Sequence, residues 1–251
     1  MSRRNASGFG FVVPGVLALL IFPAFLSAAP QKPADVIQTS RGPLRITPIF
    51  HASVMLEFDG KVLYVDPGRG EYVGLPQADV ILVTHTHDDH LDKAMIERLK
   101  KPSATIGGTP AVLEAINCRE CSPVALNNGE RKTVAGVEME GIPMYNVARE
   151  GREARHPKGL WGGFILTFGD ARVYFSGDTD CTPEMKGLRN ITAAFVLGIN
   201  SAAETAQCVK EFRPKIFYPY HHRQQKAQEI ADAFKDTPEI EVRLRRMEAE
   251  Q

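Results

Sequence analysis

Three histidines and two aspartates crowd into residues 85–90, which read His-Thr-His-Asp-Asp-His and follow an apolar stretch. Imidazole nitrogens and carboxylate oxygens are the ligands that zinc and similar divalent cations prefer. Alternate residues of an extended segment point the same way, so His85 and His87 can bind one cation. Asp89 and His90 follow where the chain begins to turn, and they can face a second cation a few ångströms away. The run therefore predicts a metal site at the end of a buried strand, in a fold that brings distant stretches of the chain to it.

Two later segments supply further candidate ligands. Asp178 follows the stretch Val-Tyr-Phe-Ser-Gly at 173–177, and His221 follows Ile-Phe-Tyr-Pro-Tyr at 216–220. Each stretch is typical of a buried strand. His222 is the neighbouring alternative to His221. Adjacent residues of an extended segment point apart, so we expect only one of the two to bind a cation.

The ordered set of three motifs resembles the metallo-β-lactamase superfamily, whose signature is a His-x-His-x-Asp-His run at the end of a strand. Members also carry a bridging aspartate after a second strand and a histidine after a late strand, and Asp178 and His221 match those positions. The resemblance runs from about Leu44 to the C-terminus. Within the superfamily, the chain looks most like the branch that includes ascorbate-6-phosphate lactonase-like proteins and phospholipase D-type phosphodiesterases.

The resemblance implies a fold class and a metal content. The fold would be α/β, a four-layer αββα sandwich of two mixed β-sheets flanked by helices, with the ligands on loops at one edge. The cofactors would be two divalent metal ions, with zinc preferred and manganese or iron as alternatives. Asp89 and Asp178 would take part in catalysis, and Asp178 would bridge the two ions. The implied metal ligands are His85, His87, Asp89, His90, Asp178 and His221.

One position departs from the pattern of the superfamily. Many members place a third histidine for the first ion in a Pro-x-x-His context, whereas this chain reads Pro-Met-Tyr-Asn at 143–146. The carbonyl oxygen of Asn146 is a weaker zinc ligand than a neutral imidazole. His156 can complete the site instead. Asn146 and His156 are therefore candidates for an additional ligand or a substrate contact, and an exposed loop position is the competing interpretation of His156.

Two further residues are candidates for supporting roles. A metal-bound histidine usually donates its second ring N–H to a carboxylate or a carbonyl group. Asp66 ends a predicted strand where the superfamily places an aspartate that supports a ligand histidine, so we assign it that role. His51 begins the partner strand, at a position where this branch also tends to carry histidine. A buried histidine with no role in the site would give the same sequence pattern.

Turn signals between apolar runs predict two β-hairpins. An Asp-Gly pair at 59–60 suits the positive φ angles of a tight turn, and a Gly-Asp pair at 169–170 repeats the arrangement. Helices are predicted over 93–101 and from 201 to about 212, after two of the ligand segments. Strands that alternate with helices indicate mixed sheets with helices outside. The predicted strands span 53–58, 61–66, 163–168 and 172–176.

Charge limits the classes of partner. Thirty basic residues balance thirty acidic ones, so no overall field attracts nucleic acid or an anionic membrane. The expected partner is a small-molecule substrate, and the oligomeric state stays open. A charged segment near the predicted site holds Arg149, Arg152, Arg155 and Lys158 together with Glu150 and Glu153. Arginines there can bind a phosphate or carboxylate of an anionic substrate, although a charged surface loop is the commoner explanation.

The N-terminus is predicted to direct export. Arg3 and Arg4 precede the apolar stretch 9–26, and Ser-Ala-Ala at 27–29 provides the small residues that signal-peptide cleavage requires. Residues 1–29 are therefore a predicted signal peptide, and the protein is expected in the periplasm or outside the cell. An uncleaved N-terminal anchor, which would be the only membrane attachment, is the alternative.

The remaining chain is predicted to hold one domain. Residues 30–43, with three prolines and few apolar residues, are predicted to be a linker, and residues 44–251 to be the hydrolase domain. Cys118 and Cys121 have Cys-x-x-Cys spacing, which fits a local disulfide or two unpaired thiols. Cys181 is interpreted as a packing residue.

These observations lead to two hypotheses about function. The first is a metal-dependent hydrolase that uses a metal-activated hydroxide to cleave a lactone, ester or phosphodiester bond in a small, anionic substrate. The second is a metabolite-binding or sensing protein with a degraded metal site and little catalysis. The number of tightly bound ions per chain separates the two.

Overall fold

The computed structural model describes residues 33–247 except for 148–152, 199–200, 223 and 246. The predicted signal peptide lies outside the described residues and stays an expectation. None of the helices in the described part of the chain is long and apolar enough to cross a membrane.

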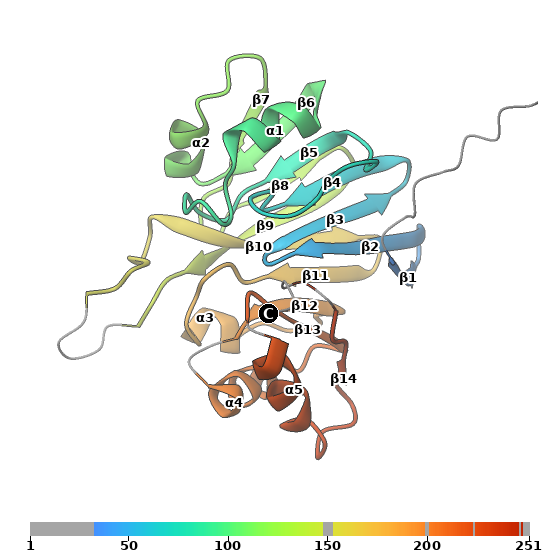
Figure 1. Ribbon diagram of the computed structural model, residues 1–251, viewed down its shortest axis with the longest axis vertical. Coiled ribbons are helices and arrows are strands. Elements are labelled where there is room, and N and C mark those ends of the chain that lie inside the picture. Colours follow the sequence, from blue (N-terminus) through green and yellow to red (C-terminus); the bar gives the residue numbers. More distant parts are fainter. Residues whose placement is uncertain (1–32, 148–152, 199–200, 223, 246, 248–251) are drawn as a thin grey trace, which may run out of the picture. The chain divides into compact units, whose positions relative to one another are not determined.

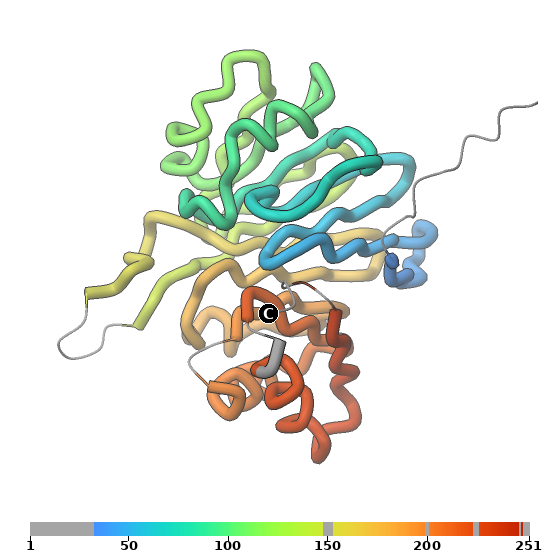
Figure 2. Tube along the Cα trace, viewed as in Figure 1, coloured from blue at the N-terminus to red at the C-terminus, as the bar shows by residue number. Residues whose placement is uncertain are grey.

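The strands of the described residues form two seven-stranded sheets. In both sheets, strands that neighbour one another are consecutive in the chain (Figure 1). The first half of the chain thus builds one sheet and the second half builds the other, as the colours of Figure 2 show. The first sheet contains β1 (Asp35–Thr39), β2 (Gly42–Phe50), β3 (Ser53–Phe58), β4 (Lys61–Val65), β5 (Ala78–Leu82), β6 (Lys100–Gly108) and β7 (Ser122–Ala125). The second contains β8 (Arg131–Val134), β9 (Val137–Met144), β10 (Trp161–Phe168), β11 (Ala171–Phe175), β12 (Ala193–Leu197), β13 (Ile216–Tyr220) and β14 (Glu241–Val242).

Helices cover the outer face of each sheet, which gives four layers (Figure 1). In β5, Val80 and Leu82 face the second sheet, whereas Ile81 packs toward the helices. In β12, Phe195 faces the first sheet and Val196 packs against helices on the other side. This alternation follows from the two-residue period of a strand, and it makes the inner strands apolar on both faces. The αββα sandwich confirms the predicted fold class. The helices are α1 (Lys93–Leu99), α2 (Pro110–Ile116), α3 (Pro183–Lys186), α4 (Ala202–Phe212) and α5 (Gln224–Asp232).

Both predicted hairpins form, as β3–β4 and β10–β11. Asp59 and Gly60 have φ angles of 49° and 70°. This pair of positive angles is the one that a two-residue type I′ turn requires, and its twist matches that of the flanking strands. The turn chemistry read from the sequence therefore fixes the register of β3 against β4.

Both predicted helices form, and each begins directly after its N-cap residue, Asp92 or Ser201. The Asp92 carboxylate accepts hydrogen bonds from two amides of the first turn of α1, and the Ser201 hydroxyl accepts one from the amide of Glu204 in α4. The first helix ends at Leu99 rather than at the predicted Lys101. The reason is that the next residues are already extended as β6 and pair with β5.

The predicted linker is wrong from Asp35 onward. The segment forms β1, which pairs with β2 from Asp35 opposite Ile46 to Thr39 opposite Gly42. Only Ile37 of this edge strand points into the core, where it is 8% exposed. A strand that needs one inward residue leaves almost no apolar signal in the sequence, which explains the error.

Asp35 ties the first sheet to the end of the second. Its carboxylate accepts hydrogen bonds from Arg245 Nε at 2.9 Å and Nη2 at 2.5 Å, and from the Tyr218 hydroxyl at 2.9 Å. Burial raises the pKa of Asp35, but the hydrogen bonds from Arg245 and Tyr218 outweigh burial and lower the pKa below its usual 3.8. The segment before the predicted domain start is therefore part of the domain.

All four cysteines are paired. Cys118 bonds to Cys121, which is one of the two interpretations left open by their spacing. Cys181 bonds to Cys208 of α4, so its interpretation as a packing residue is wrong. The two residues are 27 positions apart, and only the packing of α4 beside the loop after β11 brings their Cα atoms to 5.8 Å.

We expect Asp35→Asn to lower the free energy of unfolding by about 2 kcal/mol, because hydrogen bonds to a charged group contribute about 1.5–3 kcal/mol. The pKa of Asp35 is lowered in the folded state, so this contribution should be present at neutral pH and lost as the pH falls below about 4. Urea unfolding at several pH values measures both effects.

The matched control is Asp59→Asn, which removes the same charge from an exposed pair with Arg41. We expect it to change the free energy of unfolding by less than about 0.5 kcal/mol. Equal effects of the two substitutions would contradict a structural role for Asp35.

Candidate metal centre

Loops from both sheets meet at one edge of the sandwich. The loops after β5, β9, β11 and β13 hold the histidine run, His156, Asp178 and His221 respectively. Metal-ligating atoms from these loops form overlapping groups in which all atoms of a group lie within 4.8 Å of one another. Parallel strands present their carboxyl ends at the same edge of a sheet, and this arrangement brings residues more than 130 positions apart into contact.

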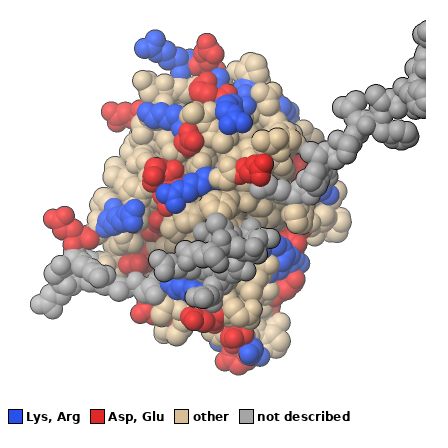
Figure 3. Space-filling view, in the orientation of Figure 1, with Lys and Arg blue, Asp and Glu red and all other residues tan. Residues whose placement is uncertain are grey.

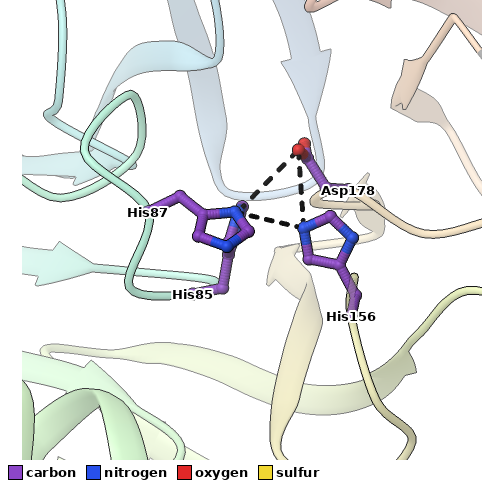
Figure 4. A group of neighbouring side chains, drawn as sticks. All are labelled: His85, His87, His156 and Asp178. Carbon is purple, nitrogen blue, oxygen red and sulfur yellow. Dashed lines mark hydrogen bonds and ion pairs between the residues drawn. The ribbon is translucent and has the colours of Figure 1, made fainter. Parts of the chain in front are cut away.

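The first cluster contains His85, His87, His156 and Asp178 (Figure 4). His87 Nδ1 lies 3.0 Å from His85 Nε2 and 3.2 Å from His156 Nε2. Asp178 Oδ2 lies 3.8 Å from the Nε2 atoms of both His85 and His156. Four ligands at the usual distance from a tetrahedral zinc ion are about 3.3 Å apart. The three nitrogens and one oxygen therefore have the spacing of a single zinc site.

The second cluster contains Asp89, His90, His221 and again Asp178. His90 Nε2 lies 3.1 Å from Asp178 Oδ1, and His221 Nε2 lies 3.4 Å from Asp178 Oδ2 and 3.2 Å from Asp89 Oδ2. Asp178 therefore faces both clusters, as expected of a bridging carboxylate. All six ligands predicted from the motifs come together at this edge.

Several polar atoms of the second cluster lack hydrogen bonds of good geometry. Asp89 Oδ1, His90 Nε2 and Asp178 Oδ1 are buried and have no such partner among the described residues. A buried polar atom without a partner costs about 1–3 kcal/mol, and more when it is charged. Three of them at one point fit the lone pairs and negative charge that a divalent cation requires.

The imidazoles of the first cluster are in the form that binds metal. Burial lowers the pKa of His85 to about 2 and that of His156 to about 4. Burial and the nearby Arg155 charge also lower the pKa of His87. All three rings are therefore neutral at pH 7, with a lone pair available for a cation.

The second cluster holds more charge. Burial raises the pKa of Asp178, but the His90 imidazole beside it outweighs burial and holds the pKa well below its usual range. Burial lowers the pKa of His90, but the Asp66 and Asp178 carboxylates outweigh it and raise the pKa to about 10. A cation at His90 Nε2 would therefore replace a proton.

Asp66 lies where a supporting carboxylate was predicted. It is fully buried, and its Oδ2 atom accepts a hydrogen bond from His90 Nδ1 at 2.8 Å. Thr84 donates to the same carboxylate through its amide at 2.7 Å and its hydroxyl at 2.8 Å. Because that hydroxyl has one proton, it must accept from His85 Nδ1, 3.1 Å away. Asp66 and Thr84 thus direct the Nε2 atoms of His85 and His90 into the two clusters.

His156, and not Asn146, supplies a ring nitrogen to the first cluster. Asn146 Oδ1 accepts hydrogen bonds from the His156 amide at 3.0 Å and from His156 Nδ1 at 2.8 Å. Asn146 therefore orients the imidazole, as a carbonyl group often does for a metal-bound histidine. The interpretation of His156 as an exposed loop residue is wrong, because only 4% of its surface is exposed.

His51 lies against the second cluster. Its Nε2 atom is 3.2 Å from Asp89 Oδ2, and its ring centroid is 3.8 Å from that of His221. The φ angles of His51, Asp66 and His221 are 55°, 48° and 51°. Residues other than glycine rarely adopt this left-handed conformation, and the strain concentrates at functional sites. His222 contacts the Pro219 carbonyl instead and is in neither cluster.

The spacing of the 85–90 run and the resemblance to the superfamily supplied the predicted site residues, whereas Thr84 was missed. A threonine between an apolar strand and a histidine carries no sequence signal that distinguishes it. The glycine before Asp178 was also missed. Gly177 has a φ angle of 58°, and a Cβ atom there would lie 2.4 Å from Met144 Sδ and 3.1 Å from Thr84 Cβ, so a larger residue would strain this turn.

An αββα sandwich with two adjoining His/Asp clusters at one edge defines a metallo-β-lactamase-fold protein with a candidate two-cation centre. The family described as the beta-lactamase superfamily domain matches residues 45–221. The chain therefore belongs to this superfamily, which confirms the resemblance seen in its motifs.

Relatives support the class of enzyme. The chain is 29% identical over 197 residues to a protein of Archaeoglobus fulgidus, which covers 71% of this chain and 83% of that protein. It is 26% identical over 219 residues to one of Roseobacter denitrificans, with 77% and 94% covered. Both relatives are named metal-dependent hydrolases, in agreement with the predicted enzyme class.

Solved structures are similar as well. A crystallised Parabacteroides distasonis protein, proposed to be a metal-dependent hydrolase, has a TM-score of 0.80 and 36% identity and covers 87% of this chain and 100% of its own. The metallo hydrolase Igni18 of Ignicoccus hospitalis shares the fold, with a TM-score of 0.65, 18% identity, and 82% and 96% coverage. The lactonase-like or phosphodiesterase branch stays a prediction.

We expect Asn146→Leu to weaken cation binding at the first cluster about 10–100-fold, because the His156 imidazole loses the acceptor that fixes its tautomer. Asn146→Asp keeps an acceptor oxygen and should retain most of the affinity. Zn²⁺ titration of metal-free protein measures both. Equal losses in the two variants would show that the acceptor is not the cause.

Proposed function

We propose that the chain is a hydrolase that binds two divalent cations, zinc by preference, and cleaves a lactone, ester or phosphodiester bond in a small anionic substrate. The observation that carries the proposal is the pair of clusters that share Asp178. A site with three neutral imidazoles and a carboxylate suits zinc better than the oxygen-preferring cations. Manganese and iron remain the alternatives for the second, more oxygen-rich cluster.

Each side chain has a distinct task in this proposal. Divalent cations bound here supply a nucleophilic hydroxide at neutral pH and stabilise negative charge on the substrate. Asp178 holds the two clusters at a fixed separation through its two oxygens. Asp89 contributes the second negative charge. In the metal-free chain, hydrogen bonds from His221 and His51 lower the pKa of Asp89, so its carboxylate is ionised and available to a cation. Buried, oriented ligands need no rearrangement during the reaction.

Arg155 supports an anionic substrate. It precedes His156, it is exposed, and its charge lowers the pKa of His87 after the larger effect of burial. Arg155 makes no hydrogen bond or ion pair within the described residues, so its guanidinium group is available to an anion. Lys158 is not, because its Nζ atom lies 2.8 Å from Glu184. Arg149 and Arg152 lie outside the described residues.

Surface charge favours a small molecule over a polyanion. On the face drawn in Figure 3, basic and acidic side chains are interspersed rather than gathered by sign. The whole chain has no net charge. Proteins that bind nucleic acid usually present a basic patch or stripe.

The proposed location is the periplasm or the exterior of the cell. Two disulfides support an oxidising compartment, since disulfides are rare in the reducing cytosol. The export signal and the alternative of an uncleaved anchor both rest on residues 1–29.

A sensing protein with a degraded site is the second candidate, and the geometry favours it less. Its premise was the missing third histidine for the first ion. The position of His156 in the first cluster removes that premise.

The experiment that tests the function measures metal content and turnover together. Purified protein loaded with Zn²⁺ or Mn²⁺ is assayed with lactones, bis-p-nitrophenyl phosphate and a cephalosporin. We expect at least one ion per chain, and a loss of turnover of more than about 100-fold in His87→Ala, since even supporting residues contribute 10–100-fold. His222→Ala is the matched control and should keep the metal. Turnover that survives both chelation and His87→Ala would refute the proposal, and binding of metal without turnover of any substrate would favour the sensor.

Arg155→Gln should raise KM for an anionic substrate about 10-fold and leave kcat within about 3-fold, because a lost charge-assisted hydrogen bond is equivalent to about 1.5 kcal/mol or more. A neutral ester should show no change. The control is Arg213→Gln. Arg213 ends α4 just before β13 begins, whereas His221 follows the end of β13, so the two residues lie at opposite ends of this strand. A rise in KM for neutral and anionic substrates alike would contradict recognition by charge.

A further inference from the structure

Trp161 lies against all three imidazoles of the first cluster. It opens β10 and is buried, with 8% of its surface exposed. Its ring centroid is 5.5 Å from that of His85, 5.2 Å from that of His87 and 5.7 Å from that of His156. The ring planes are inclined at 53°, 68° and 62°. Inclined rings let the positive edge of one meet the negative face of the other.

The backbone around Trp161 is fixed by the first sheet and its loops. The Trp161 carbonyl accepts a hydrogen bond from Asn128 at 3.1 Å, and the preceding carbonyl accepts one from Thr109 at 2.9 Å. The next amide, that of Gly162, donates to the Thr84 carbonyl at 3.3 Å. These contacts hold the indole beside the cluster.

The indole itself is not held by a hydrogen bond. Its Nε1 atom is buried and has no hydrogen-bond partner among the described residues, although a buried tryptophan N–H usually finds one. Leaving this donor unpaired costs free energy. The contacts of the ring with the imidazoles are therefore the interactions that explain an aromatic, rather than an aliphatic, side chain at this point.

We propose that Trp161 is a positioning residue that sets the cation affinity of the first cluster. It covers the three imidazoles, keeps water from them, and holds His156, which comes from a separate loop, against His85 and His87. A water-poor surrounding strengthens the interaction between a cation and its ligands. The inference rests on the proposed function, because it requires that the first cluster binds a divalent cation.

Titration of the full-length, metal-free protein with Zn²⁺ alone tests the proposal. His87→Ala and His221→Ala identify which of the two binding events belongs to which cluster. We expect Trp161→Leu to weaken binding at the first cluster about 10–100-fold and to leave the second within about 3-fold. Trp161→Phe keeps an aromatic ring beside the imidazoles and should restore most of the affinity. With Co²⁺, the visible absorption bands of the first-cluster ion should change in Trp161→Leu, because its ligands are no longer held in the same geometry.

Phe164→Leu is the matched control. Phe164 also lies in β10 and is fully buried, but it faces the core between the sheets. The control should lower the melting temperature and keep the Zn²⁺ affinity. An equal loss of Zn²⁺ affinity in both leucine variants, or wild-type affinity and Co²⁺ bands in Trp161→Leu, would overturn the inference. A wild-type protein that binds no Zn²⁺ would overturn the proposed function and the inference with it.

Fluorescence gives a second, independent readout, because Trp161 is the only tryptophan of the chain. Its emission should change when Zn²⁺ binds the first cluster. The change should disappear in His87→Ala and persist in His221→Ala. A response that persists in His87→Ala and disappears in His221→Ala would contradict the assignment of Trp161 to the first cluster.

Discussion

The site depends on one buried carboxylate. Asp178 lies 3.1 Å from His90, 3.4 Å from His221 and 3.8 Å from both His85 and His156. A charge taken out of water needs compensation from partners of opposite charge or from several hydrogen bonds. The protonated His90 imidazole provides that compensation in the metal-free chain, and a bound cation would add to it. The four imidazoles come from three loops, because His85 and His90 follow β5, His156 follows β9 and His221 follows β13. Both sheets must therefore form before their loops can bring these imidazoles to Asp178.

The backbone at this edge is held in conformations that the rest of the domain enforces. His51, Asp66 and His221 adopt positive φ angles, and the His221 amide donates to the His51 carbonyl at 3.2 Å. Strained residues of this kind persist only where surrounding structure leaves no alternative. Here the two sheets, apolar on both faces and covered by helices, are rigid enough to impose that strain. Loops carry the chemistry, and the core fixes where the loops begin and end.

Local patterns predicted the hairpins, the helices and the metal site at 85–90, and the resemblance of the ordered motifs to the superfamily supplied the αββα fold and the full ligand set. The run at 85–90 and the hairpin turns are identified by residues within six positions of one another, so they can be recognised without knowledge of distant partners. Features that depend on distant partners were missed. The strand around Ile37 is stabilised by its pairing with β2, the disulfide to Cys208 depends on helix packing, and Thr84 acquires its role only when Asp66 lies beside it. The sequence does not decide the role of His156 for the same reason, since its ring nitrogen belongs to a cluster that no single segment defines.

Burying the metal-ligating groups at this edge costs free energy of folding when no cation is bound. The metal-free chain is destabilised by buried polar atoms without hydrogen bonds, such as Asp89 Oδ1 and His90 Nε2. The buried carboxylate of Asp178, which faces both clusters, adds to this cost. A cation that binds the folded chain and not the unfolded one raises the free energy of unfolding, so metal affinity and folding stability are linked. The Asp66–Thr84 hydrogen bonds and the Trp161 ring act on both, because they hold the ligands in place before a cation arrives. Asp66, Thr84 and Trp161 bind no metal, but they restrict the motion of the ligand side chains in the metal-free protein. Less conformational entropy is then lost when a cation binds, so the cation binds more tightly.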